Sequence, residues 1–574
     1  MRGIFTMWAS TLALAVLGPV QAQTLSLGAT TGATVQPLLG VNIGPGPQGE
    51  AGNADLAAAY RERGVGLVRT HDYYGPLDMA TLYPDRSKDP LVATSYNFSG
   101  VLDLTYRRSS DSVFNAIVDG GFEPYFRLGD SYNNVNPPTP AQLPNWVQAA
   151  VQVLRHYREG QWGGRVSNFR YVEIGNEPDN AQFWPAPRTT AEFNQLYEQT
   201  AKALRAAFPS LKLGGPGWAP SGCLAPDGQA KVRSLLDHVK STSAPMDFMS
   251  FHVYNSDPAV YASCAQFYRN ELDTRGLQSV ALHITEWNTP NGSAGSAVAQ
   301  LRYNAEGAAR MTAAWMALQS NGVSESTVYR GSDPSPTAPE FYGIFYADGR
   351  AKKVGDAFRL WRQFTAYPSV VSVTGAPTGV SALAAQTATG ARAVLLANTG
   401  SSAASLSVAL PDSSPWSAYV ASLLTVNDAG EGVGSTALTS ASVSLPAKTS
   451  ALLQLVPRSQ ALGVTAQASG GTSALSLSLQ TTVAAQDVGR SGQVYVAALV
   501  AGQWYAYNGR SWALWSSGEL PAAFTGLLPP TLTLNPLSAQ DVRGLSGVPL
   551  YVGYGTSTQD MVANSRYRLA YTLP

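Results

Sequence analysis

Short apolar runs alternate with longer amphipathic stretches from residue 38 to residue 367. Eight of the apolar runs predict strands, at residues 38–44, 65–71, 122–129, 170–177, 211–218, 247–255, 281–288 and 326–332. Helical patterns lie between them, as at 190–208 and 304–322, and residues 351–368 predict the last helix. Alternating strands and helices imply a parallel sheet. Eight such units predict an α/β fold, a closed (β/α)8 TIM barrel.

The pattern changes after Pro368, where Ser, Thr, Ala and Val dominate and turn signals recur at short intervals. Short strands at regular spacing predict a β-sandwich, then a linker at residues 457–471 and a further all-β unit. The expected domains are a signal peptide at 1–22, the catalytic barrel at 23–370, the β-sandwich at 371–457 and an accessory all-β domain at 458–574.

Charge and the N-terminus point to an exported protein. Charged residues make up 13% of the chain, and 38 basic residues balance 38 acidic ones, which argues against a nucleic-acid partner. Arg2, the apolar run from Ile4 to Val20, and Ala22 resemble a cleavable signal peptide, with an uncleaved anchor as the alternative. We therefore expect a secreted or periplasmic protein with no membrane span after cleavage.

The chain has two cysteines, Cys223 and Cys264. Two cysteines cannot form a structural zinc site by themselves, and in an exported chain they can pair. Both follow predicted strands, on adjacent loops of one barrel face. We expect a disulfide, with two buried thiols as the alternative.

Two carboxylates fall at predicted strand ends. Glu177 ends the fourth predicted strand and Glu286 stands near the end of the seventh, 109 positions later. In a TIM barrel catalytic groups sit at the carboxyl ends of the strands, so both side chains are expected in one bowl. Cleavage of a glycosidic bond requires such a pair. The alternatives are an ordinary Asn-Glu-Pro turn for Glu177 and a structural ion pair for Glu286.

The motifs EIGNEPD (173–179), FHVYN (251–255) and HITEWN (283–288), in this order, resemble the retaining glycosidases of clan A, and specifically glycoside hydrolase family 39. The resemblance covers roughly residues 38 to 457. That family contains β-xylosidases, α-L-iduronidases and bacterial exopolysaccharide hydrolases. The resemblance implies a retaining double displacement, and we expect no cofactor and no metal.

The resemblance also implies roles for single residues. Glu177 would be the general acid/base and Glu286 the nucleophile, while Asn176 would hydrogen-bond the sugar 2-hydroxyl. The acid is expected to lie near the other carboxylate and away from solvent, which keeps it protonated near neutral pH. His283 lies at an odd offset from Glu286 and is expected to face outside the barrel.

Five further residues are expected to line the substrate site. Arg69 resembles the clan arginine beside the nucleophile, although a structural salt bridge is the alternative. His71 resembles a sugar-contacting residue, with a core histidine as the alternative. His252 and Tyr254 alternate along one strand and face the same side, and Tyr254 resembles the tyrosine that hydrogen-bonds the nucleophile. Trp287 is expected to form a wall of the sugar site or to pack in the core.

The segment 70–90 departs from the family pattern and leaves the sugar open. A β-xyloside is the expected substrate. The alternatives are a bacterial exopolysaccharide, or a carbohydrate-binding barrel without catalysis. An iduronidase needs cations for a uronate carboxylate, and the candidates for this role are Arg107, Arg108, Arg127 and Arg330.

The C-terminal unit contains a predicted hairpin at Asn508-Gly509. Trp504 shares one face of its strand with Ala506, while Tyr505 and Tyr507 share the other. One set is expected in the core and the other nearer solvent. The exposed set is expected to form a packing or oligomer surface, with binding of a glycan or another envelope protein as the alternative.

Overall fold

The structure is a computed structural model that describes residues 22–46, 54–102, 108–338, 340–411, 415–457, 462–484, 487–564 and 566–574. The expected signal peptide at 1–22 lies outside the described residues except for Ala22, and so does Arg107. None of the described helices is both long and apolar enough to cross a bilayer.

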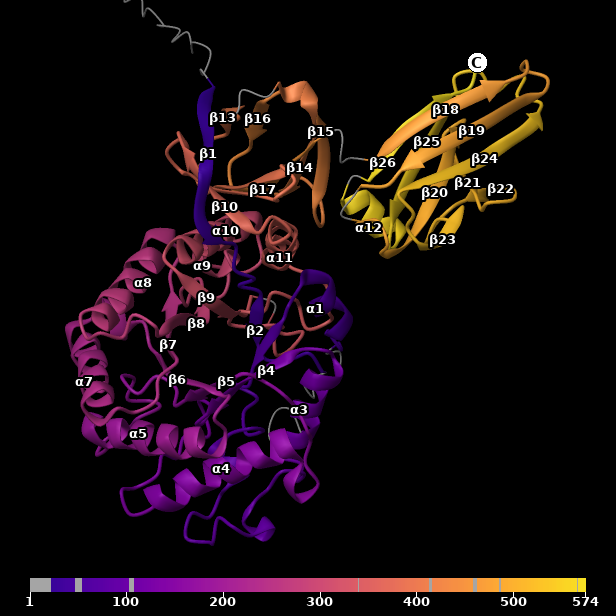
Figure 1. Ribbon diagram of the computed structural model, residues 1–574. Coiled ribbons are helices and arrows are strands. Elements are labelled where there is room, and N and C mark those ends of the chain that lie inside the picture. The colour runs from indigo at the N-terminus through magenta and orange to yellow at the C-terminus, as the bar shows by residue number, and fades with distance from the viewer. Residues whose placement is uncertain are drawn as a thin grey trace, which may run out of the picture.

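Eight parallel strands close into a barrel in the lower part of Figure 1, which confirms the predicted fold. Seven of the predicted strand segments each contain one of them, and the eighth, 326–332, overlaps the second half of the last strand. The strands are β2 (Gly40–Asn42), β3 (Leu67–Arg69), β4 (Glu123–Leu128), β5 (Tyr171–Ile174), β6 (Lys212–Trp218), β7 (Phe248–Tyr254), β8 (Ala281–Asn288) and β9 (Val323–Val328).

Helices surround the barrel, and their ends follow local sequence signals. Thr189 and Glu192 form a capping box at the start of α5, because each side chain accepts a hydrogen bond from the other residue's backbone N–H. Asn304 caps the helix that begins at Ala305. The helices are α1 (Ala57–Arg63), α2 (Met79–Leu82), α3 (Ser110–Asp119), α4 (Leu143–Glu159), α5 (Thr190–Ala207), α6 (Ser221–Leu224), α7 (Pro226–Thr242), α8 (Pro258–Asp273), α9 (Ala297–Gln300), α10 (Ala305–Ser320) and α11 (Lys353–Phe364).

A nine-stranded sheet stands above the barrel in Figure 1, and it corrects the expected domain boundary. Its first strand, β1, lies N-terminal to the barrel, pairs antiparallel with β10 and pairs parallel with β13. The first strand of the expected barrel domain at 23–370 therefore belongs to the nine-stranded sheet and not to the barrel. The strands are β1 (Gln23–Thr34), β10 (Ser369–Thr374), β11 (Val380–Gln386), β12 (Arg392–Asn398), β13 (Ala404–Ala409), β14 (Tyr419–Val426), β15 (Gly434–Leu438), β16 (Ser442–Leu445) and β17 (Thr449–Pro457).

Alternating residues of this sheet enter two different cores. Leu395 and Ala397 of β12 belong to the large core that also contains the barrel helices α10 and α11. Val394 and Leu396 belong to a second core enclosed by the sheet itself. The period of two residues along a strand separates the two sets. The barrel and the nine-stranded sheet therefore share one continuous hydrophobic core.

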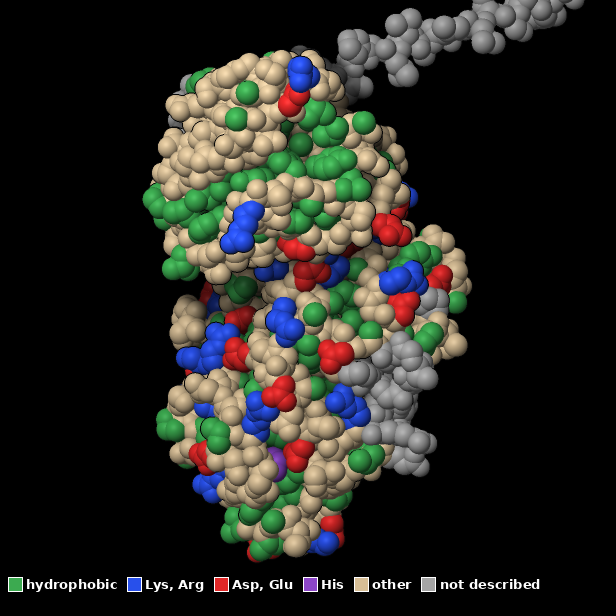
Figure 2. Space-filling view, turned by 90° about the vertical axis from the view of Figure 1, so that its right-hand side faces the viewer, with side chains coloured by type: hydrophobic (Ala, Val, Ile, Leu, Met, Phe, Trp, Pro, Cys, Tyr) green, Lys and Arg blue, Asp and Glu red, His purple; other side chains and the backbone are tan. Residues whose placement is uncertain are grey.

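The C-terminal unit lies to one side of that body (Figure 1) and has a core of its own between two sheets. Its first strand, β18, falls inside the predicted linker at 457–471, of which residues 458–461 are not described. Figure 2 shows few charged side chains on the face of this unit that points to the viewer. The elements are β18 (Gly463–Ser469), β19 (Leu475–Thr482), β20 (Ser491–Val500), β21 (Gln503–Tyr507), β22 (Trp512–Trp515), β23 (Phe524–Leu527), β24 (Thr531–Gln540), β25 (Pro549–Gly555), α12 (Thr558–Ala563) and β26 (Tyr567–Thr572).

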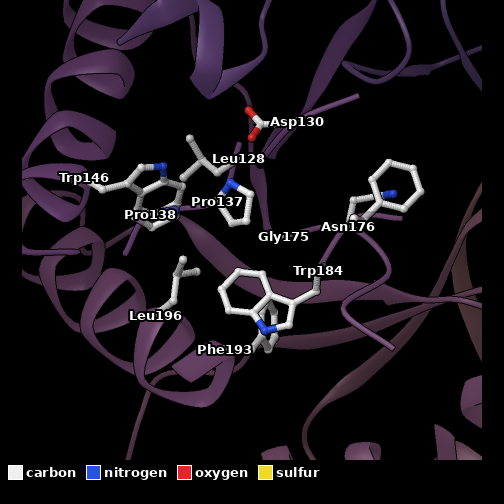
Figure 3. A pocket seen from close by; sticks show the side chains of 12 residues that line it. Leu128, Asp130, Pro137, Pro138, Trp146, Gly175, Asn176, Trp184, Phe193 and Leu196 are labelled. Carbon is white, nitrogen blue, oxygen red and sulfur yellow. The ribbon is translucent and has the colours of Figure 1, made fainter. Parts of the chain in front are cut away.

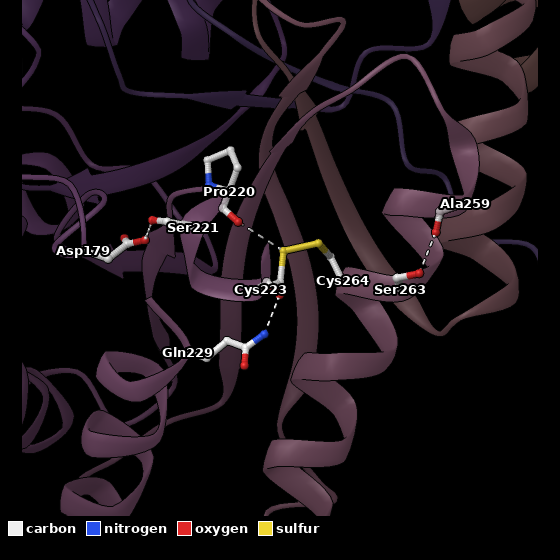
Figure 4. The surroundings of a disulfide bond; sticks show 8 residues. All are labelled: Asp179, Pro220, Ser221, Cys223, Gln229, Ala259, Ser263 and Cys264. Carbon is white, nitrogen blue, oxygen red and sulfur yellow. Dashed lines mark hydrogen bonds between the residues drawn. A yellow bond between two sulfur atoms is a disulfide. The ribbon is translucent and has the colours of Figure 1, made fainter. Parts of the chain in front are cut away.

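The two cysteines form the expected disulfide. Cys223 in α6 and Cys264 in α8 have Cα atoms 5.3 Å apart and are separated by 41 positions in the sequence (Figure 4). Both side chains are buried. The bond therefore connects two helices that follow consecutive barrel strands.

Candidate active site

Glu177 lies on the loop that follows β5, in a backbone conformation that side chains rarely adopt. Its φ is 44°, in the left-handed region, and its backbone N–H donates to Gly217 O at 2.9 Å. The side chain is 7% exposed, and Asn180 donates to its Oε2 at 2.9 Å. Such strained positions cluster at functional sites. The Asn-Glu-Pro segment is thus a turn that carries a buried carboxyl.

Glu286 reaches the same space because β8 contains an irregularity. Along β7, Phe251 pairs with Ile284 and the next residue, His252, pairs with Glu286. One extra residue, Thr285, is thereby accommodated in β8, and both Thr285 and Glu286 point into the barrel.

The same irregularity corrects the expected orientation of His283. Its ring is stacked on Phe248 inside the barrel, with centroids 4.3 Å apart. Its Nδ1 lies 2.9 Å from the Tyr125 hydroxyl. Strict alternation counted back from Glu286 placed His283 outside, but the extra residue shifts that count by one. Burial lowers the pKa of His283 to about 3, so the ring is neutral.

Arg69, at the end of β3 and fully buried, connects the residues of the site. Its Nη1 donates to Glu286 Oε1 at 2.6 Å, and its Nη2 donates to Asn176 Oδ1 at 2.6 Å. Its Nε donates to Glu173 Oε2 at 2.7 Å. Burial opposes the charge of Arg69, but these two carboxylates outweigh that effect and raise its pKa. One permanent cation thus contacts Glu286 and Glu173 directly and does not contact Glu177.

The two candidate catalytic carboxyls face each other across His252. One oxygen of Glu177, one oxygen of Glu286 and a ring nitrogen of His252 all lie within 4.8 Å of one another. Carboxyl groups about 5–5.5 Å apart are typical of retaining glycosidases, and about 6.5–9.5 Å of inverting ones. One oxygen of Glu177 and one of Glu286 thus lie within a distance close to the separation of the retaining kind.

The same three side chains form the one cluster with metal-like spacing among the described residues. Their polar atoms are already engaged. Arg69 and Tyr254 donate to Glu286, Asn180 donates to Glu177, and His252 contacts both Glu177 and Thr285. The polar atoms of this cluster are thus held by hydrogen bonds with one another and with neighbouring side chains.

The two carboxyls differ in their electrostatic surroundings. Burial raises the pKa of Glu177 to about 7, and the hydrogen bond from Asn180 and the more distant charge of Arg69 offset only part of this effect. Burial also raises the pKa of Glu286, while the adjoining cation of Arg69 lowers it. Because Arg69 contacts Glu286 directly, Glu286 is the carboxyl that ionises first.

His71 and Tyr254 both contact Glu286. The Tyr254 hydroxyl donates to Glu286 Oε2 at 2.7 Å, and His71 Nε2 lies 3.1 Å from Glu286 Oε1. Burial, reinforced by Arg69, lowers the pKa of His71 well below its ordinary value, so the ring is neutral. Its Nδ1 has no hydrogen-bond partner among the described residues and can accept from a ligand. Asn176 Nδ2 is likewise without a partner there.

Trp287 does not line this site. It lies on the outer side of the barrel, is 1% exposed, and its ring contacts Trp315 edge-on, with centroids 5.4 Å apart. Its Nε1–H donates to Ser326 Oγ at 2.7 Å. Since Glu286 points inward, its neighbour packs against α10, so the expectation of a sugar-contacting wall is not met and the core alternative holds.

The site includes four buried residues that the motifs did not single out: Asn42, Asp72, Glu173 and Thr285. Asn42 accepts from Arg69 at 3.0 Å, and Asp72 accepts from the Tyr329 hydroxyl at 2.7 Å. Glu173 carried a usable signal, because a glutamate inside an otherwise apolar strand must find a partner. The other three carry no comparable signal in the sequence.

An aromatic crevice adjoins the site at Asn176. Trp146, Trp184 and Phe193 surround it, and Asp130 stands at its opposite side (Figure 3). Phe183 also lines this crevice, and its ring centroid is 6.0 Å from that of His71. Asn176 therefore borders this crevice, whereas Glu177 and Glu286 do not line it.

The arginines considered for a uronate are placed as follows. Arg127 lies inside the barrel and its Nη2 donates to Asp78 at 2.6 Å, so a carboxylate of the protein already balances its charge. Arg330 is fully buried, and its guanidinium lies over the Phe341 ring at 5.7 Å from the centroid. Neither presents an exposed cation to a ligand.

Comparison with known proteins matches part of the barrel to a family of glycosyl hydrolases. Residues 39–290 match the family described as glycosyl hydrolases family 39. A β-xylosidase of Geobacillus stearothermophilus is 27% identical over 249 residues, which are 39% of this chain and 47% of the relative. Human α-L-iduronidase is 28% identical over 168 residues, 29% of this chain and 23% of the relative. The chain thus spans less than half the length of these curated relatives.

Among solved structures, a glucosidase of Croceicoccus marinus superposes with a TM-score of 0.60 at 23% identity, covering 76% of this chain and 99% of that one. This likeness shows a common fold. The barrel carries Glu177 on the loop after β5 and Glu286 near the end of β8. Paired carboxyls at the carboxyl ends of barrel strands suit the cleavage of a glycosidic bond. The match to glycosyl hydrolases family 39, at residues 39–290, spans β2 to β8 and includes Glu177 and Glu286.

Proposed function

We propose that the protein is a retaining glycoside hydrolase that cleaves O-glycosidic bonds by double displacement, with Glu177 as acid/base and Glu286 as nucleophile. The observation that carries this proposal is the pair of carboxyls whose nearest oxygens lie within 4.8 Å, of which Glu286 alone contacts Arg69. An ionised nucleophile beside a protonated acid is what the first step of a retaining mechanism requires.

In the first step a Glu286 oxygen attacks the anomeric carbon. The bond from that carbon to the leaving oxygen breaks, and the leaving oxygen takes the proton of Glu177. Arg69 and Tyr254 hold the Glu286 carboxylate by hydrogen bonds of 2.6 and 2.7 Å and fix its attack direction. The products are an alcohol and a glycosyl ester on Glu286.

In the second step Glu177, now a carboxylate, takes a proton from water. The water oxygen bonds to the anomeric carbon and Glu286 leaves with its electron pair. Because the Glu286 charge is absent from the ester, the pKa of Glu177 falls between the steps, which suits its change from acid to base. Two inversions at one carbon retain its configuration.

Asn176 and His71 are proposed to bind the sugar. Asn176 Nδ2 is a buried donor without a partner, and His71 Nδ1 is a buried acceptor without one, among the described residues. Unpaired buried polar groups are costly unless a ligand satisfies them. We assign Asn176 to the 2-hydroxyl, where the bond strengthens in the transition state.

The proposed substrate is a β-xyloside. The named β-xylosidase relative supports this choice, and the ion-paired Arg127 and buried Arg330 offer little to a uronate. A bacterial exopolysaccharide is the alternative substrate. A panel of aryl β-xylosides, glucosides and uronides, with purified exopolysaccharides, discriminates between them through relative kcat/KM.

We further propose that the protein acts outside the cytoplasm and that its C-terminal unit contacts a glycan. The Cys223–Cys264 disulfide supports an oxidising location. Pairing of β21, β25 and β26 places Trp504, Tyr551 and Leu569 on one sheet face. Trp504 is 36% exposed, and Tyr551 lies beside it with ring centroids 5.6 Å apart. Exposed aromatic rings offer stacking surfaces to sugars.

A trapped intermediate tests the proposal. An activated 2-fluoro-β-xyloside should inactivate the enzyme and leave one covalent adduct, located by peptide mass spectrometry on Glu286. Glu286→Gln should not be labelled. A label on another residue would overturn the assignment of the nucleophile, and turnover with inverted configuration would overturn the mechanism.

A further inference from the structure

A chain of buried hydrogen bonds runs from Arg69 to the acid carboxyl. Arg69 Nε donates to Glu173 Oε2 at 2.7 Å, and Thr285 Oγ1 donates to Glu173 Oε1 at 2.7 Å. His252 Nε2 lies 3.2 Å from Thr285 Oγ1, and His252 Nδ1 lies 2.8 Å from Glu177 Oε1. Glu173 and His252 are 0% exposed and Thr285 is 1% exposed.

The direction of each bond follows from the fixed charge at one end. Burial raises the pKa of Glu173, but Arg69 outweighs it and the net pKa is lowered, so Glu173 is ionised and accepts only. The Thr285 hydroxyl has one hydrogen and must give it to Glu173. Its oxygen then accepts from His252, which places a hydrogen on Nε2 of that ring.

The other ring nitrogen is consequently an acceptor. Burial lowers the pKa of His252, with Glu286 and Glu173 opposing and Arg69 reinforcing the effect, so the ring carries a single hydrogen. With that hydrogen on Nε2, Nδ1 is bare. The hydrogen in the 2.8 Å contact with Glu177 Oε1 must therefore belong to the glutamic acid.

We propose that Thr285 and Glu173 are positioning residues that lock neutral His252 in its Nε2–H tautomer, so that its bare Nδ1 accepts the hydrogen bond of protonated Glu177. The inference deepens the proposed function and rests on Glu177 as the general acid. The lock stabilises the acid form through the accepted hydrogen bond. When Glu177 is a carboxylate, the lone pair of His252 Nδ1 faces its negative charge, and this repulsion destabilises the carboxylate form.

The other charged and titratable groups around this pair come from four parts of the barrel. They are Arg69 on β3, His71 and Asp72 after β3, Asp179 after β5, and Glu286 on β8. Arg69 favours the carboxylate form of Glu177, and Asp72 disfavours it. The tautomer lock therefore acts together with burial to keep Glu177 protonated before the glycosidic bond breaks.

After the leaving oxygen has taken the Glu177 proton, the carboxylate and Nδ1 present lone pairs to each other. This arrangement is relieved when Glu177 takes a proton from the incoming water, which is the second step of the reaction. The lock thus makes Glu177 a stronger base at the stage that requires a base.

The test compares Thr285→Val with Thr285→Ser in the full chain. Valine leaves His252 Nε2–H without an acceptor, so the hydrogen moves to Nδ1 and donates to the Glu177 carboxylate. We expect the basic limb of the kcat/KM profile on an unactivated β-xyloside to move to lower pH by about one unit. Serine retains the hydroxyl and should restore the wild-type limb.

A second measurement reads the tautomer without any turnover. The chain has five histidines, so ¹⁵N-histidine labelling gives few ring signals, and His252→Asn identifies the relevant ones. In wild type at pH 6 we expect a proton on Nε2 and none on Nδ1. A protonated Nδ1 would overturn the proposal even if the enzyme hydrolyses xylosides.

The two measurements separate the failure of this inference from that of the proposed function. An unchanged basic limb in Thr285→Val, with full turnover, contradicts the lock and leaves the double displacement intact. If no glycoside is hydrolysed at all, the proposed function fails, while the NMR experiment still decides the tautomer. If Thr285→Val does not fold, the wild-type spectrum alone decides it.

Discussion

At the scale of single residues, Glu177 and Glu286 have the same chemical group but different contacts. The Glu286 side chain contacts Arg69, His71 and Tyr254. The Glu177 side chain instead makes hydrogen bonds with Asn180 and His252, which are neutral. A carboxylate beside a cation stays ionised, and a buried one without a cation stays protonated. The contact of Arg69 with Glu286 alone therefore distinguishes the proposed nucleophile, Glu286, from the proposed acid, Glu177.

Removal of the acid should affect substrates according to their leaving groups. In Glu177→Ala we expect kcat/KM on an unactivated xyloside to fall by about 10²–10⁴-fold, because protonation of a poor leaving group is lost. Glycosylation by a dinitrophenyl xyloside should be nearly unchanged. Azide should then accelerate its turnover and give a glycosyl azide, since azide needs no general base.

A matched control is Glu159→Ala, which removes a glutamate that is 54% exposed at the end of α4. It should leave all of these rates unchanged. Wild-type rates in Glu177→Ala on the unactivated substrate would mean that the Asn-Glu-Pro segment is only a turn.

The raised pKa of Glu177 also predicts a pH-dependent stability. The carboxyl has a pKa of about 7 in the folded protein, against 4.5 for the unfolded reference. The folded state thus holds an extra proton between these values, so stability falls as pH rises from 4.5 to 7. At pH 8, Glu177→Gln should therefore have a free energy of unfolding up to about 3 kcal/mol greater than that of wild type. It should also unfold at a higher temperature.

The difference should be smaller at pH 5, where Glu177 of the folded wild-type protein is protonated and carries no charge. Thermal unfolding of the two proteins across this range measures it. A gap that is equal at pH 5 and pH 8 would contradict the raised pKa. Such a gain in stability with a loss of activity is typical of active-site groups.

At the scale of elements, the strand pattern predicted the barrel and the positions of Glu177 and Glu286 but not the residues that contact them from behind. The count of eight strands placed Glu177 and Glu286 at one rim, because the carboxyl ends of parallel strands meet there. Glu173 and Thr285 were missed because their roles depend on contacts across 104 to 112 positions of sequence. No local pattern encodes such a pairing.

Two other differences have local causes. Trp287 was expected near the sugar because it adjoins Glu286, but adjacent strand residues face opposite sides. His283 was assigned to the wrong side because the irregularity at Thr285 breaks the alternation. Strand β1 was assigned to the barrel by its position in the chain, although it completes the nine-stranded sheet.

The disulfide between α6 and α8 should contribute measurably to stability. It closes a loop of 41 positions, for which the entropic account gives roughly 3–4 kcal/mol. The double variant Cys223→Ser/Cys264→Ser should lose about this much free energy of unfolding in denaturant titrations. Reduction of wild type should lower its stability to a similar extent.

Reduction should leave the double variant unchanged, which serves as the control. Two thiols titrating in the unreduced, denatured wild-type protein would show that the bond is absent. Because neither cysteine contacts Glu177 or Glu286, kcat on an aryl xyloside should be retained in the double variant at temperatures where it is folded.

At the scale of the whole molecule, the three units are coupled to different degrees. The nine-stranded sheet contributes Leu395, Ala397 and Leu452 to the same core as α10 and α11 of the barrel. Thr312 of α10 and Ser450 of β17 also share a hydrogen bond of 2.9 Å. The C-terminal unit instead encloses its own core. Barrel and nine-stranded sheet should therefore fold as one body, with the C-terminal unit separable.

Truncation tests this organisation and the proposed glycan contact together. A protein ending at Arg458 should fold and retain its kcat/KM on an aryl xyloside, because every residue assigned to the site precedes that position. A protein ending at Val370 should be insoluble, since it loses the sheet that covers α10 and α11.

Binding to insoluble xylan, measured by co-sedimentation, should weaken when the C-terminal unit is removed. It should also weaken in the full-length double variant Trp504→Ala/Tyr567→Ala, because these two aromatic side chains are 36% and 42% exposed. Loss of aryl xyloside hydrolysis in a folded protein ending at Arg458 would place part of the active site in the C-terminal unit. Unchanged co-sedimentation with xylan would show that the aromatic face of this unit does not bind xylan.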